Sequence, residues 1–510
     1  MVAPPAVESV GYSAITRETE RAMTADCVLA IDQGTTSSRG LVLAADGSVV
    51  GEHKVEFPQH FPRPGWVEHD LLEIWHSVLQ AVARAVAQVP GEWGRIAAIG
   101  ITNQRETVGL WTRASGAPVG RAIVWQCRRT AEVCRALDAE HGPMIRRLSG
   151  LTVDPYFSGP KLRLLLDEAE RRGLGPDELC AGTVDTWLLW RLTAGAQYAT
   201  DPTNASRTML YDIDRRRWSE ELLELMGIPA GLLADVKPSG ARFGTTAGDR
   251  VIPAGIPIRA VMGDQQSALF GQGCVAPGQA KNTYGTGCFL LVNTGDRRVD
   301  CSRGLLTTVA CDAAGDPCYA LEGSVFVGGG AVQWLRDELG IIRESAQVEA
   351  LARSVPDTGG VAFVPAFVGL GAPYWEPEAR GAILGLSRGT GRAHIARAAL
   401  EAIALQSAEV IEIMQQEGAP VKELRVDGGA CVNDLLLQMQ ADYSGVTVVR
   451  SGEVEMTALG AAALAGMGEG LWERCRIRGR GRPGSFAPAS TAAQRDEKLA
   501  AWRRAVGRVL

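Results

Sequence analysis

The chain has 510 residues, of which 46% are hydrophobic and 22% charged, and its formal net charge is −6. This composition excludes a disordered or fibrous protein. A chain of this length is usually too long to fold around a single hydrophobic core, so we expect two large globular domains. Lysine and arginine are scattered along the chain. The sequence therefore excludes a basic stripe for nucleic acid or an anionic membrane, and it favours a small-molecule partner.

Apolar stretches, cysteines and the N-terminal residues indicate in which cellular compartment the protein would be found. No stretch reaches the roughly 20 apolar residues that a membrane span needs, so we expect no span. The 11 cysteines are dispersed, with no C-x-x-C pair and no zinc-site spacing, which favours reduced thiols and a cytoplasmic location. Residues 1–25 carry several charges and no apolar signal-peptide core, so we expect a flexible N-terminal tail.

Strands and helices are expected to alternate in the first half of the chain, as they do in α/β domains. The predicted strands cover residues 28–32, 40–44, 96–102 and 258–262, and a predicted helix covers residues 71–89. Asp32 ends the first of these strands, and Asp264 closely follows the last one. Carboxylates at strand ends can hold a metal ion or accept a proton, although either residue alone could be a cap or turn residue.

A turn of small residues joins the first two strands at residues 34–38, with the sequence Gly-Thr-Thr-Ser-Ser. Its backbone N–H groups can form an anion nest, to which Thr35, Thr36 and Ser37 would add hydroxyl donors without bulk. The segment is a candidate phosphate cradle. Taken alone, an ordinary hairpin loop remains the alternative.

A second strand, turn and strand follow at residues 281–292, where Gly285 and Gly287 bracket Thr286. Two phosphate-type turns in separate parts of one chain favour phosphate binding over two unrelated hairpins. The repetition also indicates that the chain has a second, related half.

We place the domain boundary near Gly273, so that residues 26–273 form the N-terminal domain and residues 274–510 the C-terminal domain. The later elements are a strand that ends at a glycine pair, a helix that begins at an asparagine, and a C-terminal amphipathic helix. They cover residues 423–427, 433–443 and 492–509.

Other catalytic motifs are absent or lack their structural context. No G-x-x-x-x-G-K-[ST] occurs, which excludes a P-loop kinase. Residues 479–484 satisfy G-x-G-x-x-G but contain Pro483 and follow no predicted strand, and residues 158–161 satisfy S-x-x-K without its partner motifs. Glycine turns and carboxylates at strand ends are instead what phosphoryl transfer needs.

Ten segments resemble the glycerol kinase family, within the carbohydrate kinases that have two actin-like domains. They are residues 32–39, 65–70, 100–107, 123–130, 154–158, 203–209, 263–266, 282–288, 369–375 and 426–430. The resemblance implies an α/β fold with two actin-like (ribonuclease-H-like) domains that face an interdomain cleft. It also implies that the N-terminal domain binds glycerol and phosphate and that the C-terminal domain binds ATP. It implies ATP-dependent phosphorylation of glycerol to sn-glycerol 3-phosphate by a homo-oligomer, a dimer or a tetramer. The alternatives are a related polyol or ketose kinase, such as a xylulose kinase, an actin-like or chaperone-like ATPase, and an interaction protein with a decayed site, against which the intact Asp264, Arg105 and Glu106 argue.

The same resemblance implies roles for individual residues. Hydrogen bonds to glycerol would come from Arg105, Glu106, Tyr156, Asp264 and Gln265, while Trp125 and Phe289 would pack on its carbon atoms. Thr35, Thr36, Ser37 and Arg39 would lie near the terminal phosphates of ATP with Gly285 and Thr286 opposite, and Gly329, Gln333, Gly429 and Asn433 would line the nucleoside. Asp32 and Asp264 would hold Mg²⁺, and Asp264 would also be the general base.

Overall fold

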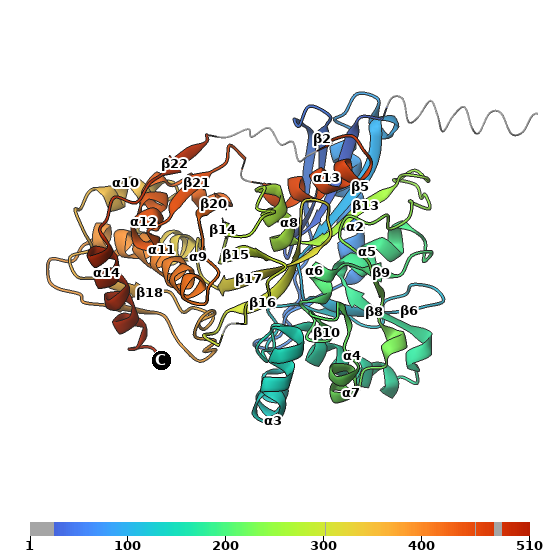
Figure 1. Cartoon of the computed structure of the whole chain (residues 1–510), viewed down its shortest axis with the longest axis horizontal. Coiled ribbons are helices and arrows are strands. Elements are labelled where there is room, and N and C mark those ends of the chain that lie inside the picture. The colour runs from blue at the N-terminus through green and yellow to red at the C-terminus, as the bar shows by residue number, and fades with distance from the viewer. Residues whose placement is uncertain (1–24, 301, 454, 474–481) are drawn as a thin grey trace, which may run out of the picture.

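The computed structural model describes residues 25–300, 302–453, 455–473 and 482–510. Two large lobes lie side by side, the first built mainly from the N-terminal half and the second from the C-terminal half (Figure 1). The predicted flexible tail lies outside the described residues except for Ala25. No helix in the described part of the chain is long and apolar enough to cross a membrane.

The first lobe contains a five-stranded sheet with the order β13-β5-β1-β2-β3. Strands β1, β2 and β3 form an antiparallel meander, while β5 and β13 run parallel to β1. Side chains of β1 alternate between two cores: Leu29 and Ile31 pack toward helix α2, and Val28 and Ala30 pack toward helix α13. The bounds are β1 (Cys27–Gln33), β2 (Ser37–Ala44), β3 (Val49–Glu56), β5 (Ile96–Asn103), β13 (Ile258–Gly263), α2 (Leu71–Val86) and α13 (Met456–Gly468).

The second lobe repeats this arrangement. Its seven-stranded sheet has the order β16-β17-β15-β14-β20-β21-β22. Strands β14, β15 and β17 form the antiparallel meander, and β20 and β21 run parallel to β14. The expected related half is therefore present, with β16 and β22 added at the edges. The bounds are β14 (Gln279–Tyr284), β15 (Cys288–Gly295), β16 (Leu306–Cys311), β17 (Pro317–Val325), β20 (Glu423–Asp427), β21 (Thr447–Arg450) and β22 (Gly484–Phe486).

Helix α13 lies on the first sheet, although its sequence belongs to the range predicted for the second domain (Figure 1). It is apolar on all sides and rich in alanine and glycine, which suits a helix that is buried all round. A Cβ atom on Gly100 of β5 would lie 2.3 Å from the Ala461 carbonyl oxygen, so only glycine permits this close approach. The predicted boundary near Gly273 stays a prediction, but α13 packs with the first lobe.

The remaining elements complete the two lobes. A four-stranded sheet with the order β4-β7-β6-β8 lies below the first sheet. Its strands are β4 (Glu68–His69), β6 (Val108–Thr112), β7 (Ala122–Ile123) and β8 (Leu179–Thr183), and shorter strands are β9 (Ala199–Thr200), β10 (Tyr211–Asp212), β11 (Arg217–Trp218), β12 (Asp235–Val236), β18 (Ala362–Val364) and β19 (Ala382–Leu384). The other α-helices are α3 (Ala131–Ser149), α4 (Ser158–Arg171), α5 (Val184–Leu192), α6 (Pro202–Ala205), α7 (Glu220–Met226), α8 (Asp264–Gly271), α9 (Gly330–Asp337), α10 (Gln347–Arg353), α11 (Arg392–Gln416), α12 (Asp434–Ser444) and α14 (Ala492–Val506).

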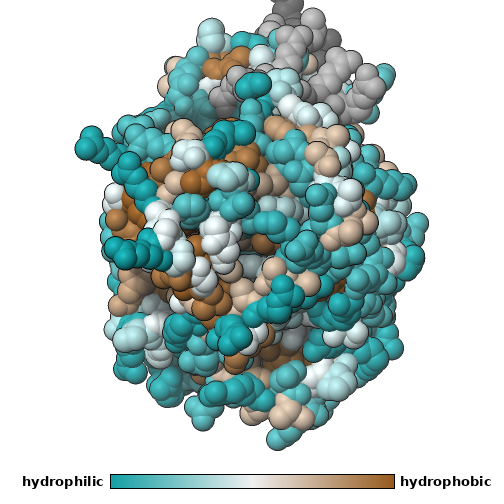
Figure 2. Space-filling view, turned by 90° about the vertical axis from the view of Figure 1, so that its left-hand side faces the viewer, coloured by the Kyte–Doolittle hydropathy of each residue, from teal (hydrophilic) through white to brown (hydrophobic). Residues whose placement is uncertain are grey.

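The end face of the second lobe is seen in Figure 2, where hydrophilic side chains separate smaller hydrophobic patches. The large apolar side chains of this lobe instead form one buried cluster between the sheet and helices α11, α12 and α14. The nine cysteines in the described ranges are all buried thiols.

Candidate active site

Arg105 and Glu106 lie in the turn that follows β5, and both are almost completely buried. Glu106 has φ of 62°, a left-handed conformation that is uncommon for a residue other than glycine. Such backbone conformations persist only where surrounding contacts hold them, and they often occur at functional sites.

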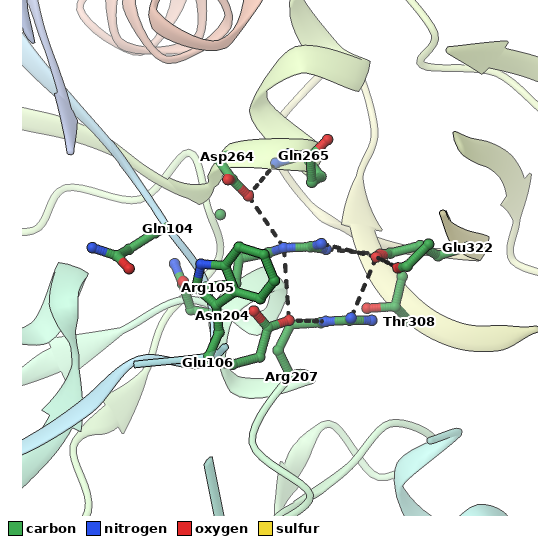
Figure 3. A network of polar contacts seen from close by, with 12 residues as sticks. Gln104, Arg105, Glu106, Asn204, Arg207, Asp264, Gln265, Thr308 and Glu322 are labelled. Carbon is green, nitrogen blue, oxygen red and sulfur yellow. Dashed lines mark hydrogen bonds and ion pairs between the residues drawn. The ribbon is translucent and has the colours of Figure 1, made fainter. Parts of the chain in front are cut away.

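The guanidinium of Arg105 is at the centre of a polar network (Figure 3). Its Nη1 and Nη2 atoms donate to the two carboxylate oxygens of Glu322 at 2.7 and 2.8 Å, and Nη1 also donates to Gln266 Oε1 at 3.1 Å. Its Nε atom lies 3.2 Å from Asp264 Oδ1. Glu322 comes from β17 of the second lobe, so the network joins the two lobes.

Arg207 closes this network from the loop after α6. Its Nε atom donates to Glu106 Oε1 at 2.7 Å, and its Nη2 atom forms an ion pair with Glu322 Oε1 at 3.3 Å. Burial acts to raise the pKa of Glu322, but the two guanidinium groups of Arg105 and Arg207 outweigh it and hold the pKa at about 2. At Glu106 the effect of burial is larger and raises the pKa. Glu322 therefore supplies the negative charge that the two arginines share.

Asp264 is the first residue of α8 and follows directly on β13. Its side chain is 27% exposed, and its Oδ1 atom accepts the backbone N–H of Gln265 at 2.7 Å. Burial raises the pKa of Asp264 above its usual range, and the positive charges of Arg105 and Lys281 oppose the rise. Lys281 is fully buried and donates to the side-chain oxygen of Gln265.

Three aromatic side chains lie beside this polar network. The Trp125 ring meets the rings of Tyr156 and Phe289 edge to face, with centroids 5.5 and 6.5 Å away. Its indole N–H donates to Thr35 Oγ1 at 2.9 Å. Tyr156 also lies 5.6 Å from the Arg207 guanidinium. The residues predicted to contact a polyol are thus brought together, and Trp125 links them to the first candidate phosphate turn.

The first turn runs from the end of β1 to the start of β2 and is closed by a hydrogen bond from Gly34 N to Ser37 O at 2.9 Å. Thr36 at its tip is exposed. Arg39 pairs with Asp32 in the β1–β2 register, and its side chain forms ion pairs with Glu52 at 3.3 Å and with Glu455. Arg39 is therefore next to the turn, between carboxylates.

The second turn joins β14 to β15, and Gly285 and Thr286 are both exposed there. The backbone N–H of Gly329 donates to Gly285 O at 2.9 Å, and a Cβ atom on Gly329 would lie 2.7 Å from that same oxygen. Gly429 is exposed and has no atom within 4 Å of where a Cβ would stand, which leaves room for a ligand. A Cβ on its neighbour Gly428 would lie 2.6 Å from Tyr284 O, which brings the glycine pair next to this turn.

Two further residues predicted for the nucleoside lie on helices. Gln333 is exposed on α9, and its backbone N–H donates to Gly329 O at 3.1 Å. Asn433 begins α12 as expected, and its side-chain oxygen accepts the Leu436 N–H at 2.9 Å as an N-cap. The capping bond leaves the amide NH₂ of Asn433 available to a ligand.

The carboxylates fit a magnesium ion that is bound together with phosphate. Within the described ranges, no group of three or more His, Cys, Asp or Glu side chains is placed to hold a metal ion. Mg²⁺, however, usually keeps several waters and needs only one or two carboxylates beside phosphate oxygens. Burial, opposed by Arg39, raises the pKa of Asp32 to about 7, and the charges of Glu455 and Asp264 contribute to the rise. A cation would relieve this concentration of negative charge.

Four residues of this cluster were given no role by sequence reasoning: Arg207, Gln266, Lys281 and Glu322. Glu322 was detectable as a single carboxylate within the otherwise uncharged strand at residues 317–325. A charged side chain in a buried strand is rarely found without a partner. Sequence spacing does not reveal that partner, because Arg105 lies 217 residues away.

Two other cavities lie away from these residues. One of about 510 Å³ is lined by residues that include Arg113 and Trp190, and one of about 920 Å³ by residues that include Tyr443 and Trp502. Neither is lined by a residue of the network. Side-chain chemistry, rather than cavity size, therefore identifies the candidate site.

Family domain models match both lobes. The N-terminal domain of the FGGY family of carbohydrate kinases matches residues 27–271, and the C-terminal domain matches residues 280–469. The chain belongs to the FGGY family of carbohydrate kinases. As a member of this kinase family it uses ATP.

Curated relatives of this FGGY kinase extend the similarity over nearly the whole chain. A glycerol kinase of Bordetella parapertussis is 53% identical over 489 residues, covering 94% of this chain and 96% of that protein. A glycerol kinase of Aromatoleum aromaticum is 54% identical over 488 residues, covering 94% and 98%. The crystal structure of Plasmodium falciparum glycerol kinase with ADP is similar with a TM-score of 0.87 at 34% identity, covering 95% of this chain and 98% of that one. These matches confirm the two-domain α/β fold.

Proposed function

We propose that this FGGY kinase transfers the γ-phosphoryl group of MgATP to glycerol, forming sn-glycerol 3-phosphate and ADP. The observation that carries the proposal is that hydrogen-bonding side chains line one side of the site, here called the polar wall, and aromatic rings line another, here called the aromatic wall. Arg105, Glu106 and Asp264 form the polar wall, and Trp125 and Phe289 form the aromatic one. A small triol has hydroxyl groups for the first and C–H groups for the second.

This arrangement would also give specificity. A site that pairs buried polar groups with substrate hydroxyls rejects analogues that lack those hydroxyls much more strongly than apolar contacts could. Tyr156 and Gln265 would complete the hydroxyl contacts, since both border the network. The glycerol kinase activity of the curated relatives, at 53% and 54% identity, supports the same substrate.

Asp264 would act as the general base. Its raised pKa makes it a stronger base than an exposed aspartate, while Arg105 keeps the ionised form available. It would accept the proton of the attacking glycerol hydroxyl as the new O–P bond forms and the bond to the leaving ADP oxygen breaks. The role of Arg105 in the ground state would be to orient the substrate hydroxyl next to Asp264.

ATP would bind between the two glycine turns. Thr35, Thr36 and Ser37 would donate to its terminal phosphates from the first turn, and Gly285 and Thr286 from the second. The open space at Gly429 and the side chains of Gln333 and Asn433 would accommodate the nucleoside. Mg²⁺, held by Asp32 with Asp264 nearby, would neutralise phosphate charge.

A coupled assay of ADP release tests the proposal. We expect rapid release with glycerol, and slow release with xylulose or without any acceptor. Faster turnover with xylulose would favour a ketose kinase, and ADP release that does not depend on any polyol would favour an actin-like ATPase. Either outcome would contradict the proposed function.

A further inference from the structure

Three of the residues proposed to bind glycerol are held by two buried residues outside the predicted site. The Nε atom of Arg207 donates to Glu106 Oε1 at 2.7 Å, and its guanidinium carbon lies 5.6 Å from the centroid of the Tyr156 ring. Both carboxylate oxygens of Glu322 accept hydrogen bonds from the Arg105 guanidinium. Arg207 and Glu322 are both 0% exposed. They lie behind the residues that face the substrate.

The contacts of Arg105 determine which of its N–H groups can reach a substrate. A guanidinium has five N–H donors. Glu322 and Gln266 occupy both hydrogens of Nη1 and one of Nη2. The remaining donors, on Nε and Nη2, lie on one edge, and Nε is the atom that lies 3.2 Å from Asp264.

We infer that Glu322 and Arg207 are positioning residues for the polyol, because they orient the Nε edge of Arg105 and the carboxylate of Glu106 toward the hydroxyl groups next to Asp264. This inference rests on the proposed glycerol kinase function. Glu322 has the larger part, since it fixes Arg105 by two parallel hydrogen bonds that allow one orientation of the guanidinium plane. Its position on β17 means that the second lobe sets the geometry of a first-lobe residue.

Glu322→Gln tests the inference, because glutamine keeps the size of the side chain but replaces one of the two acceptor oxygens by an NH₂ donor, so the two parallel bonds to Arg105 cannot both form. Glu409→Gln is the matched control. Glu409 is also buried in the second lobe and accepts hydrogen bonds from Tyr374, Trp502 and Arg503, but it lies between α11 and α14 away from the site. Both variants lose one buried carboxylate charge.

A purely structural role would affect all acceptors alike, so the affinity for glycerol is compared with that for propane-1,2-diol and propane-1,3-diol. We expect Glu322→Gln to raise the glycerol KM about 10-fold or more, with the KM for ATP within about twofold of wild type. A diol bound without the hydroxyl that Arg105 contacts would be an inhibitor rather than an acceptor, and for it the variant should change the inhibition constant by less than about threefold. Glu409→Gln should change none of these values by more than about twofold.

Equal losses for glycerol and both diols, or a Glu322→Gln profile matching that of Glu409→Gln, would overturn the positioning role. If Glu322→Gln does not fold, Glu322→Asp carries the same test, because it keeps the charge but shortens the side chain and moves the paired oxygens. The same differential loss is expected for it. Wild-type protein that shows no glycerol-dependent ADP release would instead refute the proposed function, so the two failures are distinguishable.

Discussion

Asp264 lies where β13 ends and α8 begins, with its carboxylate next to the Arg105 guanidinium. If it accepts the proton of the glycerol hydroxyl, Asp264→Asn should lower kcat by about 10²- to 10⁴-fold, which corresponds to roughly 3 to 5 kcal/mol of barrier. Asparagine keeps the size and one acceptor oxygen, so the KM for glycerol should change much less. Steady-state kinetics at saturating glycerol and MgATP measure the effect. A kcat near that of wild type would exclude Asp264 as the base.

Candidate site residues could be predicted where a chemically suitable side chain stands in a short sequence pattern that indicates its place in the fold. Asp32, Asp264 and the Gly285–Thr286 turn could be named as candidates because a carboxylate or a glycine turn at a strand end has a recognisable pattern, and their roles stay predictions. The polyol residues were inferred from family resemblance, and the structure brings them together. Glu322 and Arg207 were not predicted to have a role, because their function depends on contacts between distant segments of the chain.

Single elements were predicted closely where a strong local signal bounds them. The strand predicted at residues 423–427 matches β20 (Glu423–Asp427), which ends at a glycine pair. The helix predicted at residues 71–89 ends earlier, at Val86 in α2. Pro90 accounts for the difference, since proline disfavours helical backbone in the residue before it. The position of α13 on the first sheet was not predictable from periodicity, because an all-apolar helix has no distinct face.

Helix α13 depends on glycine for its contact with α8. A Cβ on Gly460 would lie 1.9 Å from the Ser267 carbonyl oxygen. In an isolated helix, glycine to alanine would stabilise by roughly 1 kcal/mol, but overpacking against backbone typically costs about 1 to 3 kcal/mol. We therefore expect Gly460→Ala to lower the melting temperature.

Gly468→Ala is the control in the same helix, because the nearest atoms to its Cβ would belong to the Arg259 side chain, at 3.3 Å, rather than to backbone. Thermal unfolding followed by circular dichroism compares the two variants with wild type. Gly468→Ala should leave the melting temperature unchanged or raise it. If Gly460→Ala behaved in the same way, the close packing of α13 on α8 would be wrong.

At the scale of the whole molecule, the two lobes already contact each other through β16 and β17. Glu322 binds Arg105, the Gln266 side chain donates to Val309 O at 3.0 Å, and the Ser206 hydroxyl lies 3.0 Å from that of Thr308. The Gly285–Thr286 turn joins β14 to β15, which lies next to β17 in the same sheet. A rotation of the second sheet about the β16–β17 contact would bring its nucleotide turn toward the first lobe.

We expect glycerol and ATP together to close the lobes by such a rotation, because the proposed polyol contacts lie mainly on the first lobe and most nucleotide contacts on the second. Closure would exclude water from the site and limit transfer of phosphate to water. Small-angle scattering should show a smaller radius of gyration with glycerol and a non-hydrolysable ATP analogue than for the free protein, with glycerol alone as the control. Superimposable curves for free and doubly bound protein would mean that the site is assembled without closure, and that the β16–β17 contact fixes the two lobes rather than serving as a pivot.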